Sequence, residues 1–346
     1  MKTEMLAAVL YGKEHLEVEP VAVPELGRSD VLVCVKAALT CGTDVKVFRR
    51  GYHARMIIPP AVFGHELAGD IVGVGDQVEK FRPGQRVVAA NSAPCKECYY
   101  CRRGLENLCD DLLFNNGAYA EYIRIPGRIV EHNTYELPPH VSYQDAALVE
   151  PLACVLRGVE ETGMKPEDDV AVVGLGPIGL MFVRLAKACG ARVIALGRRV
   201  AQLKRAEALG ADELISTSVT HDPVRLVREL TQGRGVDIAI EAVGKPHTWE
   251  LCVQLVRRGG TVNFFGGCPS ETRISLATAL LHYSEITCKA SFHHTPAHIR
   301  RALDLISKGV ITARDFVNRE EPLANLLEVM RHLMSHNGHL KTAIIP

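Results

Sequence analysis

The sequence predicts an α/β protein of two domains, the first rich in β-strands and the second built on a doubly wound parallel sheet. The chain has 346 residues, which is more than one hydrophobic core usually serves. Up to about residue 150, short strand-like runs are separated by glycine and proline. From Val170 onward, strand-like and helix-like runs alternate, which is typical of β-α-β units.

The first domain is predicted from short apolar runs and from a tail that returns to it. We expect its strands to include 30–37, 68–74 and 86–90. In the tail, apolar periodicity predicts helices at 297–308 and 323–335 and a closing strand at 342–345. The first domain would then comprise residues 1–153 and 293–346.

The second domain, residues 154–292, is predicted from six apolar runs with helical stretches between them. The expected strands are 170–173, 191–196, 213–216, 236–242, 260–265 and 285–290. The expected helices include 177–189, 222–231 and 246–257. Six parallel strands are what a dinucleotide-binding sheet requires.

The turn after the first of these strands is a G-x-G-x-x-G motif, made of Gly174, Leu175, Gly176, Pro177, Ile178 and Gly179. Such a turn lets the backbone approach a pyrophosphate that lies at the N-terminus of the following helix. A tight turn without a ligand is one alternative, and another adenosine cofactor is a second. The strand and helix on either side of the motif favour a nucleotide.

The end of the next strand predicts which nicotinamide cofactor binds. NAD-binding sheets carry an acidic residue there, which binds the ribose 2′-hydroxyl. This chain has Gly197, Arg198 and Arg199 instead. Guanidinium groups attract a 2′-phosphate, so we predict NADP(H) in preference to NAD(H). The alternative is that the arginines form only a solvated helix start.

Four cysteines in a turn-rich segment, with the spacing C-x2-C-x2-C-x7-C, are the most specific metal signal; they are Cys95, Cys98, Cys101 and Cys109. Four thiolates close a tetrahedral zinc site without an open position, so the site would be structural, in a lobe of about residues 91–112. An iron–sulfur cluster has a different spacing before its last cysteine. Four unliganded thiols are the remaining alternative.

A second set of metal-binding side chains is spread over the first domain. Cys41 is followed by Thr43 and Asp44, and His65 is followed by Glu66. Glu150 precedes a proline at the end of the domain. Cysteine, histidine and glutamate are suitable zinc ligands, and a small set of them leaves one position at the metal for a substrate oxygen. Taken singly, each is an ordinary packing or capping residue. Thr43 would relay a proton or make a turn hydrogen bond, and Asp44 would orient a ligand or cap a helix.

Composition excludes several classes of partner. Forty basic and forty acidic residues cancel, so no net field recruits nucleic acid or anionic lipid. The first ten residues are too short and acidic for a secretory signal, and no apolar run is long enough to cross a bilayer. We therefore expect a cytoplasmic protein with reduced thiols and a small-molecule substrate.

Together these motifs resemble the zinc-dependent medium-chain dehydrogenases, over essentially the whole chain. The resemblance implies a GroES-like catalytic domain and a Rossmann-type coenzyme domain, with two zinc ions per subunit. Cys41, His65 and Glu66 would ligate the catalytic zinc. Glu150 would be a fourth or exchangeable ligand, or would hold a zinc-bound water.

The same resemblance bears on substrate and assembly. The glutamate at position 150 resembles the sorbitol and threonine dehydrogenase branch, which predicts a secondary alcohol or polyol, or the matching ketone. Lys46 departs from that branch, where a histidine is usual. Family members dimerise through the last strand of the coenzyme sheet, 285–290 here, and many form tetramers. We expect a homodimer or homotetramer.

Three other functions compete with this one. An amino-alcohol dehydrogenase of the threonine type would use the same site on another substrate. A non-catalytic redox sensor, stabilised by zinc and binding a dinucleotide, would show no turnover. A zinc-free quinone reductase of the same superfamily would lack Cys41, His65 and Glu66, all of which are present.

Overall fold

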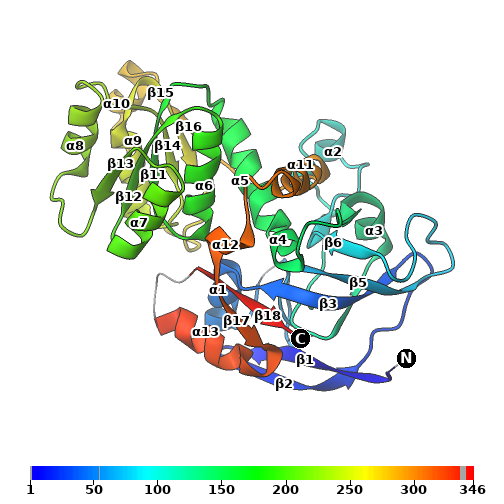
Figure 1. Cartoon of the computed structure of the whole chain (residues 1–346). Coiled ribbons are helices and arrows are strands. Elements are labelled where there is room, and N and C mark those ends of the chain that lie inside the picture. Colours follow the sequence, from blue (N-terminus) through cyan, green and yellow to red (C-terminus); the bar gives the residue numbers. More distant parts are fainter. Residues whose placement is uncertain (1, 54, 336–339) are drawn as a thin grey trace. The chain divides into compact units, whose positions relative to one another are not determined.

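The computed structural model describes residues 2–53, 55–335 and 340–346. The chain divides into two compact units (Figure 1). The first comprises Met1–Ala153 and His294–Pro346, and the second comprises Cys154–His293. The second boundary lies one residue later than the sequence predicts.

The first unit is a β-rich structure with three sheets in its described residues. The largest has seven strands in the order β10-β6-β5-β3-β18-β17, with β9 also paired to β3. The others are β2-β1-β4 and β7-β8. The strands are β1 Glu4–Gly12, β2 His15–Ala22, β3 Val31–Leu39, β4 Ala61–Val62, β5 Leu67–Val74, β6 Arg86–Ala89, β7 Ser92–Ala93, β8 Leu113–Phe114, β9 Tyr122–Ile125, β10 Thr134–Glu136, β17 Val317–Pro322 and β18 Lys341–Ile345.

The tail of the chain joins the large sheet of the first unit. β18 pairs antiparallel with β3, so that Ala343 faces Leu39 and Ile344 faces Ala38. Both strands are almost wholly buried, although β18 begins with the polar residues Lys341 and Thr342. This pairing places the start of β18 beside the end of β3, where Cys41 follows.

Short helices connect and cover the sheets of the first unit. The core contains large buried side chains, among them Leu10, Phe48 and Ile125. The helices are α1 Gly42–Arg50, α2 Tyr99–Arg102, η1 Glu106–Leu108, α3 Gly127–Asn133, α4 Tyr143–Ala147, α11 Pro296–Ser307, α12 Ala313–Phe316, η2 Leu323–Asn325 and α13 Leu326–Ser335. A further helix, α5 Val149–Thr162, leads from the first unit into the second.

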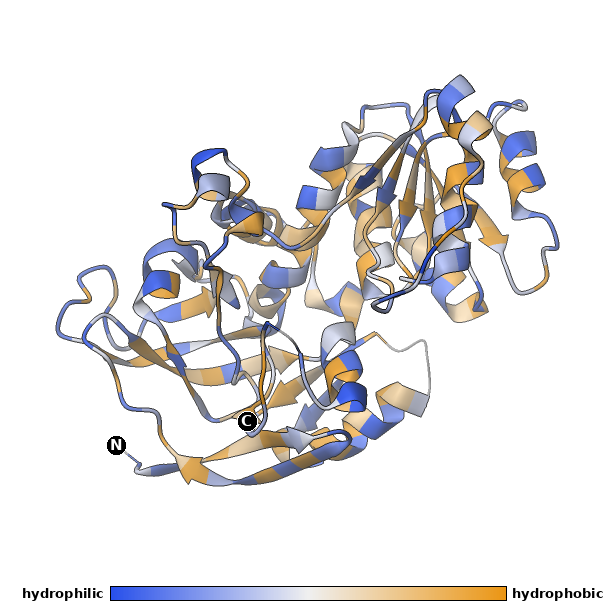
Figure 2. Cartoon of the chain, turned by 180° about the vertical axis from the view of Figure 1, so that it is seen from behind, coloured by the Kyte–Doolittle hydropathy of each residue, from blue (hydrophilic) through white to orange (hydrophobic). Residues whose placement is uncertain are grey.

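The second unit is built on a six-stranded parallel sheet in the order β13-β12-β11-β14-β15-β16. This order, with its reversal between β11 and β14, is that of a doubly wound dinucleotide-binding sheet and confirms the predicted fold class. In Figure 2 the strands of this sheet are coloured mainly as hydrophobic. The strands are β11 Asp169–Val173, β12 Arg192–Gly197, β13 Glu213–Ser216, β14 Val236–Glu241, β15 Val256–Phe264 and β16 Thr287–Ala290.

Helices cover the sheet in two pairs. α6 contacts α7, and α8 contacts α9, as right-handed crossovers on either side of the switch point require. The helices are α6 Pro177–Ala188, α7 Val200–Ala208, α8 Pro223–Leu230, α9 Pro246–Leu255 and α10 Thr278–Tyr283.

Three predicted boundaries in this unit are wrong, and the first is the start of the strand expected at 260–265, which begins at Val256. The helix expected at 246–257 ends at Leu255, because Val256 pairs with Val236 at the start of β15. The strand expected from residue 285 begins at Thr287, because Glu285 has a φ of 48°. That left-handed conformation belongs to a turn and does not fit a strand.

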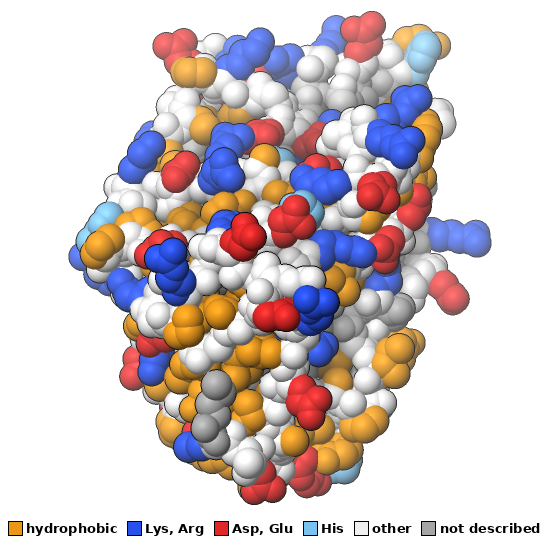
Figure 3. Space-filling model, turned by 90° about the vertical axis from the view of Figure 1, so that its right-hand side faces the viewer, with side chains coloured by type: hydrophobic (Ala, Val, Ile, Leu, Met, Phe, Trp, Pro, Cys, Tyr) orange, Lys and Arg blue, Asp and Glu red, His pale blue; other side chains and the backbone are white. Residues whose placement is uncertain are grey.

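The surface charges and the lengths of the helices agree with what the composition predicts. On the face shown in Figure 3, basic and acidic side chains are interspersed. Among the described residues, no helix is both long and apolar enough to cross a membrane.

Candidate functional site

Cys41 lies at the start of α1, in the short connection that follows β3. Its backbone is extended, with φ −120° and ψ 151°, and it is the N-cap of the helix. Its Sγ accepts a hydrogen bond from the Thr43 amide at 3.4 Å, and Asp44 accepts one from the Cys41 amide at 3.0 Å. Asp44 therefore caps the helix, and Thr43 lies in its first turn.

The structure brings Cys41 together with His65 and Glu66, which lie just before β5. One potential ligand atom from each of the three lies within 4.8 Å of the others. His65 and Glu66 are buried, and Cys41 is partly exposed. A thiol, an imidazole and a carboxylate at this separation form a donor set suited to zinc.

Asp44 has a second role in addition to capping. Its Oδ1 lies 2.9 Å from His65 Nδ1, and both side chains are almost fully buried. Because Nδ1 faces the carboxylate, Nε2 is the nitrogen left for a metal. Burial by itself would lower the pKa of His65, but Asp44, with Cys41, raises it well above the usual value.

Glu66 is held by Lys341, which the sequence patterns did not single out. Lys341 Nζ donates to both carboxylate oxygens of Glu66 at 2.6 Å and to the carbonyl oxygen of Thr40 at 3.1 Å. All three ammonium protons are thus used inside the protein. Burial raises the pKa of Glu66 to about 7, against the opposing effect of Lys341. The only sequence signal was a lysine directly before the apolar run 342–345.

Glu150 lies in the first turn of α5 and is outside the group of three donors. Its Oε1 is 3.9 Å from His294 Nε2, which in turn lies 3.1 Å from Asn91 Oδ1. The negative charge of Glu150 raises the pKa of Glu66. Glu150 is therefore close enough to act on the site electrostatically.

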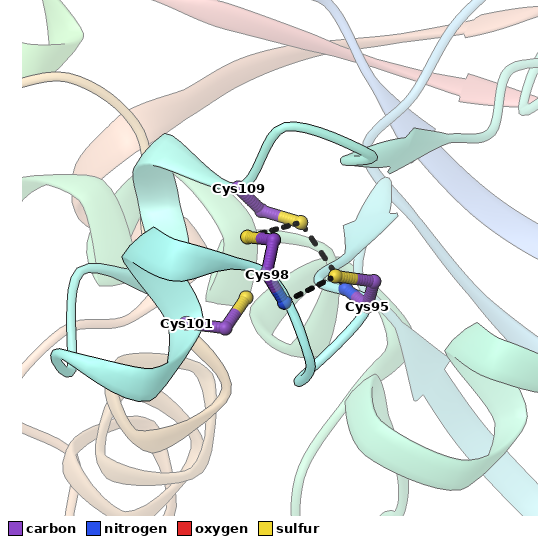
Figure 4. A group of neighbouring side chains, drawn as sticks. All are labelled: Cys95, Cys98, Cys101 and Cys109. Atoms are coloured by element: carbon purple, nitrogen blue, oxygen red, sulfur yellow. Dashed lines mark hydrogen bonds between the residues drawn. The ribbon is translucent and has the colours of Figure 1, made fainter.

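The four cysteines of the predicted lobe lie together (Figure 4). Their Sγ atoms all lie within 4.8 Å of one another, and they come from the segment around α2 and η1. The Sγ atoms of Cys98 and Cys109 are 3.9 Å apart, whereas a disulfide bond is about 2.05 Å long. Thiolates about 2.3 Å from a central zinc would be about 3.8 Å apart at the corners of a tetrahedron.

Backbone amides point at the sulfur atoms of this group. Cys98 N donates to Cys95 Sγ at 3.3 Å, and Cys95 N donates to Cys109 Sγ at 3.2 Å. Amides of Cys101 and Asp110 lower the pKa of Cys98 to about 6, whereas burial raises the pKa of Cys101 to about 12. Four thiolates would need a bound cation to be stable together.

The predicted glycine turn has the geometry of a phosphate-binding turn. Gly174 has a φ of 99°, and a Cβ on Gly179 would lie 1.7 Å from the Gly174 carbonyl oxygen. By contrast, a Cβ on Gly176, the N-cap of α6, would meet nothing within 4 Å. Leu175 is buried, and Pro177 and Ile178 begin the helix. The open position at Gly176 would let a phosphate approach the helix N-terminus.

Arg199 follows β12 and is the N-cap of α7. Its Nη1 atom is buried and has no hydrogen-bond partner among the described residues. Burial, and then the neighbouring Arg198, lower the pKa of Arg199. A Cβ on Gly197 would lie 2.7 Å from Leu175 Cδ1, so an acidic side chain there would have to displace Leu175. The strand end offers donors to an anion and has no room for a carboxylate without rearrangement.

Two family models match the chain. The alcohol dehydrogenase GroES-like domain matches residues 27–135. The zinc-binding dehydrogenase model matches residues 177–308.

Known proteins match most or all of the chain. The chain is 30% identical to sorbitol dehydrogenase of Bacillus subtilis, over 99% of this chain and 97% of that protein. It is 36% identical to L-threonine 3-dehydrogenase of Bacillus licheniformis, over 73% of each. The structure of a zinc-binding dehydrogenase from Sinorhizobium meliloti bound to NADP has 30% identity and a TM-score of 0.89, covering 100% of both chains.

Proposed function

The chain belongs to the zinc-binding dehydrogenases that include sorbitol and threonine dehydrogenases, and we propose that it oxidises a secondary alcohol or polyol with NADP, or reduces the matching ketone. The observation that carries this proposal is the group formed by Cys41, His65 and Glu66. Their donor atoms lie within 4.8 Å of one another. Asp44 and Lys341 already orient two of the three side chains.

In this proposal, each residue of the site has a defined task. Cys41, His65 and Glu66 would hold the catalytic zinc, and Asp44 orients the imidazole of His65. Bound zinc would polarise the substrate oxygen, while the nicotinamide ring would exchange hydride with the substrate. The Thr43 hydroxyl would pass the alcohol proton, and Glu150 would be a fourth or exchangeable zinc ligand or would hold a zinc-bound water.

We propose a second, structural zinc at Cys95, Cys98, Cys101 and Cys109. The thiol spacing and the inward-pointing amides support it. Four protein ligands would leave this metal without an open position, so it would contribute to folding and not to the reaction.

The preference for NADP(H) over NAD(H) is proposed from Arg199. A buried guanidinium nitrogen without an acceptor is costly, and an anion placed there would satisfy it. Arg198 is exposed beside it and would add to the attraction. Gly174, Gly176 and Gly179 would then bring the backbone up to the pyrophosphate.

The function is tested with a panel of substrates that includes sorbitol, xylitol, 2,3-butanediol and L-threonine, read at the NADPH absorbance. We expect turnover of at least one alcohol and its loss in Cys41→Ser. Serine is a good N-cap, so this variant should keep α1 intact while weakening the metal site. L-Threonine as the preferred substrate would favour the amino-alcohol alternative. Absence of turnover with the whole panel would favour the redox sensor.

The cofactor preference is tested by comparing kcat/KM for NADP and NAD in Arg199→Gln. We expect the value for NADP to fall by about 10- to 100-fold, the loss of one charge-assisted contact, and the value for NAD to stay unchanged. NAD thus serves as the control within each variant. A wild-type enzyme that uses both cofactors equally, or prefers NAD, would contradict the proposal.

We further propose that the protein is a homodimer or homotetramer in the cytoplasm. The exposed edge strand β16 supports self-association, because unpaired strand edges favour pairing with another chain. None of the eleven cysteines, all within the described residues, forms a disulfide bond, which is typical of proteins from reducing compartments.

A further inference from the structure

Asp44 receives a hydrogen bond from Tyr119, a residue outside all of the motifs considered above. The Tyr119 hydroxyl lies 2.6 Å from Asp44 Oδ2 and 3.1 Å from the Leu39 carbonyl oxygen, and it is fully buried. Both neighbours are acceptors, and a phenol has only one proton to donate. The nearer, anionic acceptor is the carboxylate, so the proton lies towards Asp44.

The position of Tyr119 is fixed from several sides. Its amide donates to the Phe63 carbonyl at 2.9 Å, and its own carbonyl accepts from the Ala8 amide at 2.8 Å. Its ring covers Gly64, where a Cβ would lie 2.6 Å from ring atom Cδ2. Phe63 and Gly64 directly precede His65, so the ring is held by the segment that carries this ligand.

The hydrogen bonds of Asp44 divide between its two oxygens. Oδ2 accepts from the Tyr119 hydroxyl and from the Cys41 amide, and Oδ1 faces His65 Nδ1 at 2.9 Å. Two donors on Oδ2 fix the plane of the carboxylate and reserve Oδ1 for the imidazole. Without the hydroxyl, the buried carboxylate would lose its shortest hydrogen bond, and at Oδ2 only the Cys41 amide would remain to fix its orientation towards His65.

We propose that Tyr119 is a positioning residue for the catalytic metal site: its hydroxyl orients Asp44, which orients His65 with Nε2 towards the metal. This inference rests on the proposed function, since it presumes a metal at Cys41, His65 and Glu66. Tyr119 acts only through Asp44. Its contribution is therefore to metal affinity and ligand geometry.

The test is Tyr119→Phe, which removes one oxygen atom and leaves the packing of the ring. The matched control is Tyr143→Phe, because the Tyr143 hydroxyl also donates to a carboxylate, Asp70, in the same unit. Zinc affinity is measured by competition with a chelator, and ligand geometry by the visible absorption of the cobalt(II)-substituted protein. The four-cysteine site in each sample is an internal reference.

We expect Tyr119→Phe to weaken zinc binding at the catalytic site by about 10- to 100-fold, as loss of an outer partner of a metal ligand usually does, and to shift its cobalt bands. Tyr143→Phe and the four-cysteine site should show neither effect. Unchanged affinity and spectrum in Tyr119→Phe would overturn the proposal, as would an equal loss in Tyr143→Phe.

Asp44→Asn provides a second test that does not depend on the tyrosine variant. It should weaken zinc binding, and adding Tyr119→Phe to it should cause little further loss, because both changes act through one side chain. Fully additive losses, or wild-type affinity in Asp44→Asn, would contradict the inference. A wild-type protein that binds zinc only at the four cysteines would overturn the proposed function as well. Two zinc ions in a wild type whose affinity Tyr119→Phe leaves unchanged would overturn this inference alone.

Discussion

Glu66 and Lys341 form a buried ion pair whose members lie far apart in the sequence. Lys341 is 3% exposed, and its ammonium group donates three hydrogen bonds, two to Glu66 and one to Thr40. Burial by itself would lower the pKa of Lys341, but the Glu66 carboxylate outweighs it and the pKa is raised. Each charge therefore depends on the other, and a zinc ion at the site would be a second positive partner for Glu66.

At the residue scale we predict that Lys341→Met destabilises the protein by about 3–5 kcal/mol, the usual cost of leaving one member of a buried pair uncompensated. Chemical unfolding of the metal-free protein measures this. Zinc at saturating concentration should reduce the loss, because it restores a positive charge beside Glu66.

The control for this prediction is the double variant Lys341→Met with Glu66→Gln. Removing both charges leaves no unpaired ion, so it should be more stable than Lys341→Met alone. A double variant that is no more stable than Lys341→Met would show that the lysine acts through packing alone.

At the residue scale, the sequence predicted the candidate metal ligands but not the residues that hold them in place. Cys41, His65 and Glu66 were found through short motifs and a family resemblance. Lys341 and Tyr119 were missed, because their contacts with Glu66 and Asp44 span 275 and 75 residues. Those contacts depend on β18 pairing with β3 and on the segment before β9 packing beside Gly64, neither of which leaves a local pattern.

At the element scale, the four-cysteine segment contains little regular structure. α2 and η1 have four and three residues, and few apolar side chains of this segment are buried. Helices this short are not stable by themselves in water. The folded structure of this segment therefore depends on a link between its four thiols.

We predict that Cys98→Ser lowers the metal content from two zinc ions per chain to one and leaves residues near 95–109 open to proteolysis. Metal analysis of the purified protein and limited proteolysis measure these effects. The matched control is Cys189→Ser, since Cys189 is an exposed thiol at the end of α6. Two zinc ions retained in Cys98→Ser would refute the structural site.

At the element scale, motifs whose partners are close in sequence were predictable, and boundaries set by pairing between distant strands were not. The cysteine spacing and the glycine turn were found because their partners lie within a few residues of one another. The end of α9 was placed too late, because Val253 and Val256 continue the helical period although Val256 belongs to a strand. Strand pairing across the sheet decided that boundary, and the sequence alone does not display it.

At the scale of the whole molecule, the parallel sheet ends in an unprotected edge. All four residues of β16 are exposed, whereas strands of parallel sheets are usually buried on both faces. None of the described residues of the neighbouring helix α10 is buried, and Tyr283 at its end is 79% exposed. An exposed strand edge of this kind is what a two-fold interface would cover.

We therefore predict that Cys288→Arg, in the middle of β16, dissociates the oligomer, because a two-fold axis would bring two added positive charges close together in a buried interface. Light scattering coupled to size-exclusion chromatography measures the mass. Leu214→Arg is the matched control: Leu214 is exposed on β13, the opposite edge of the same sheet, so this variant should keep the wild-type mass. If β13 forms the interface instead, the two variants will exchange their effects, and a monomeric wild type would rule out both edges.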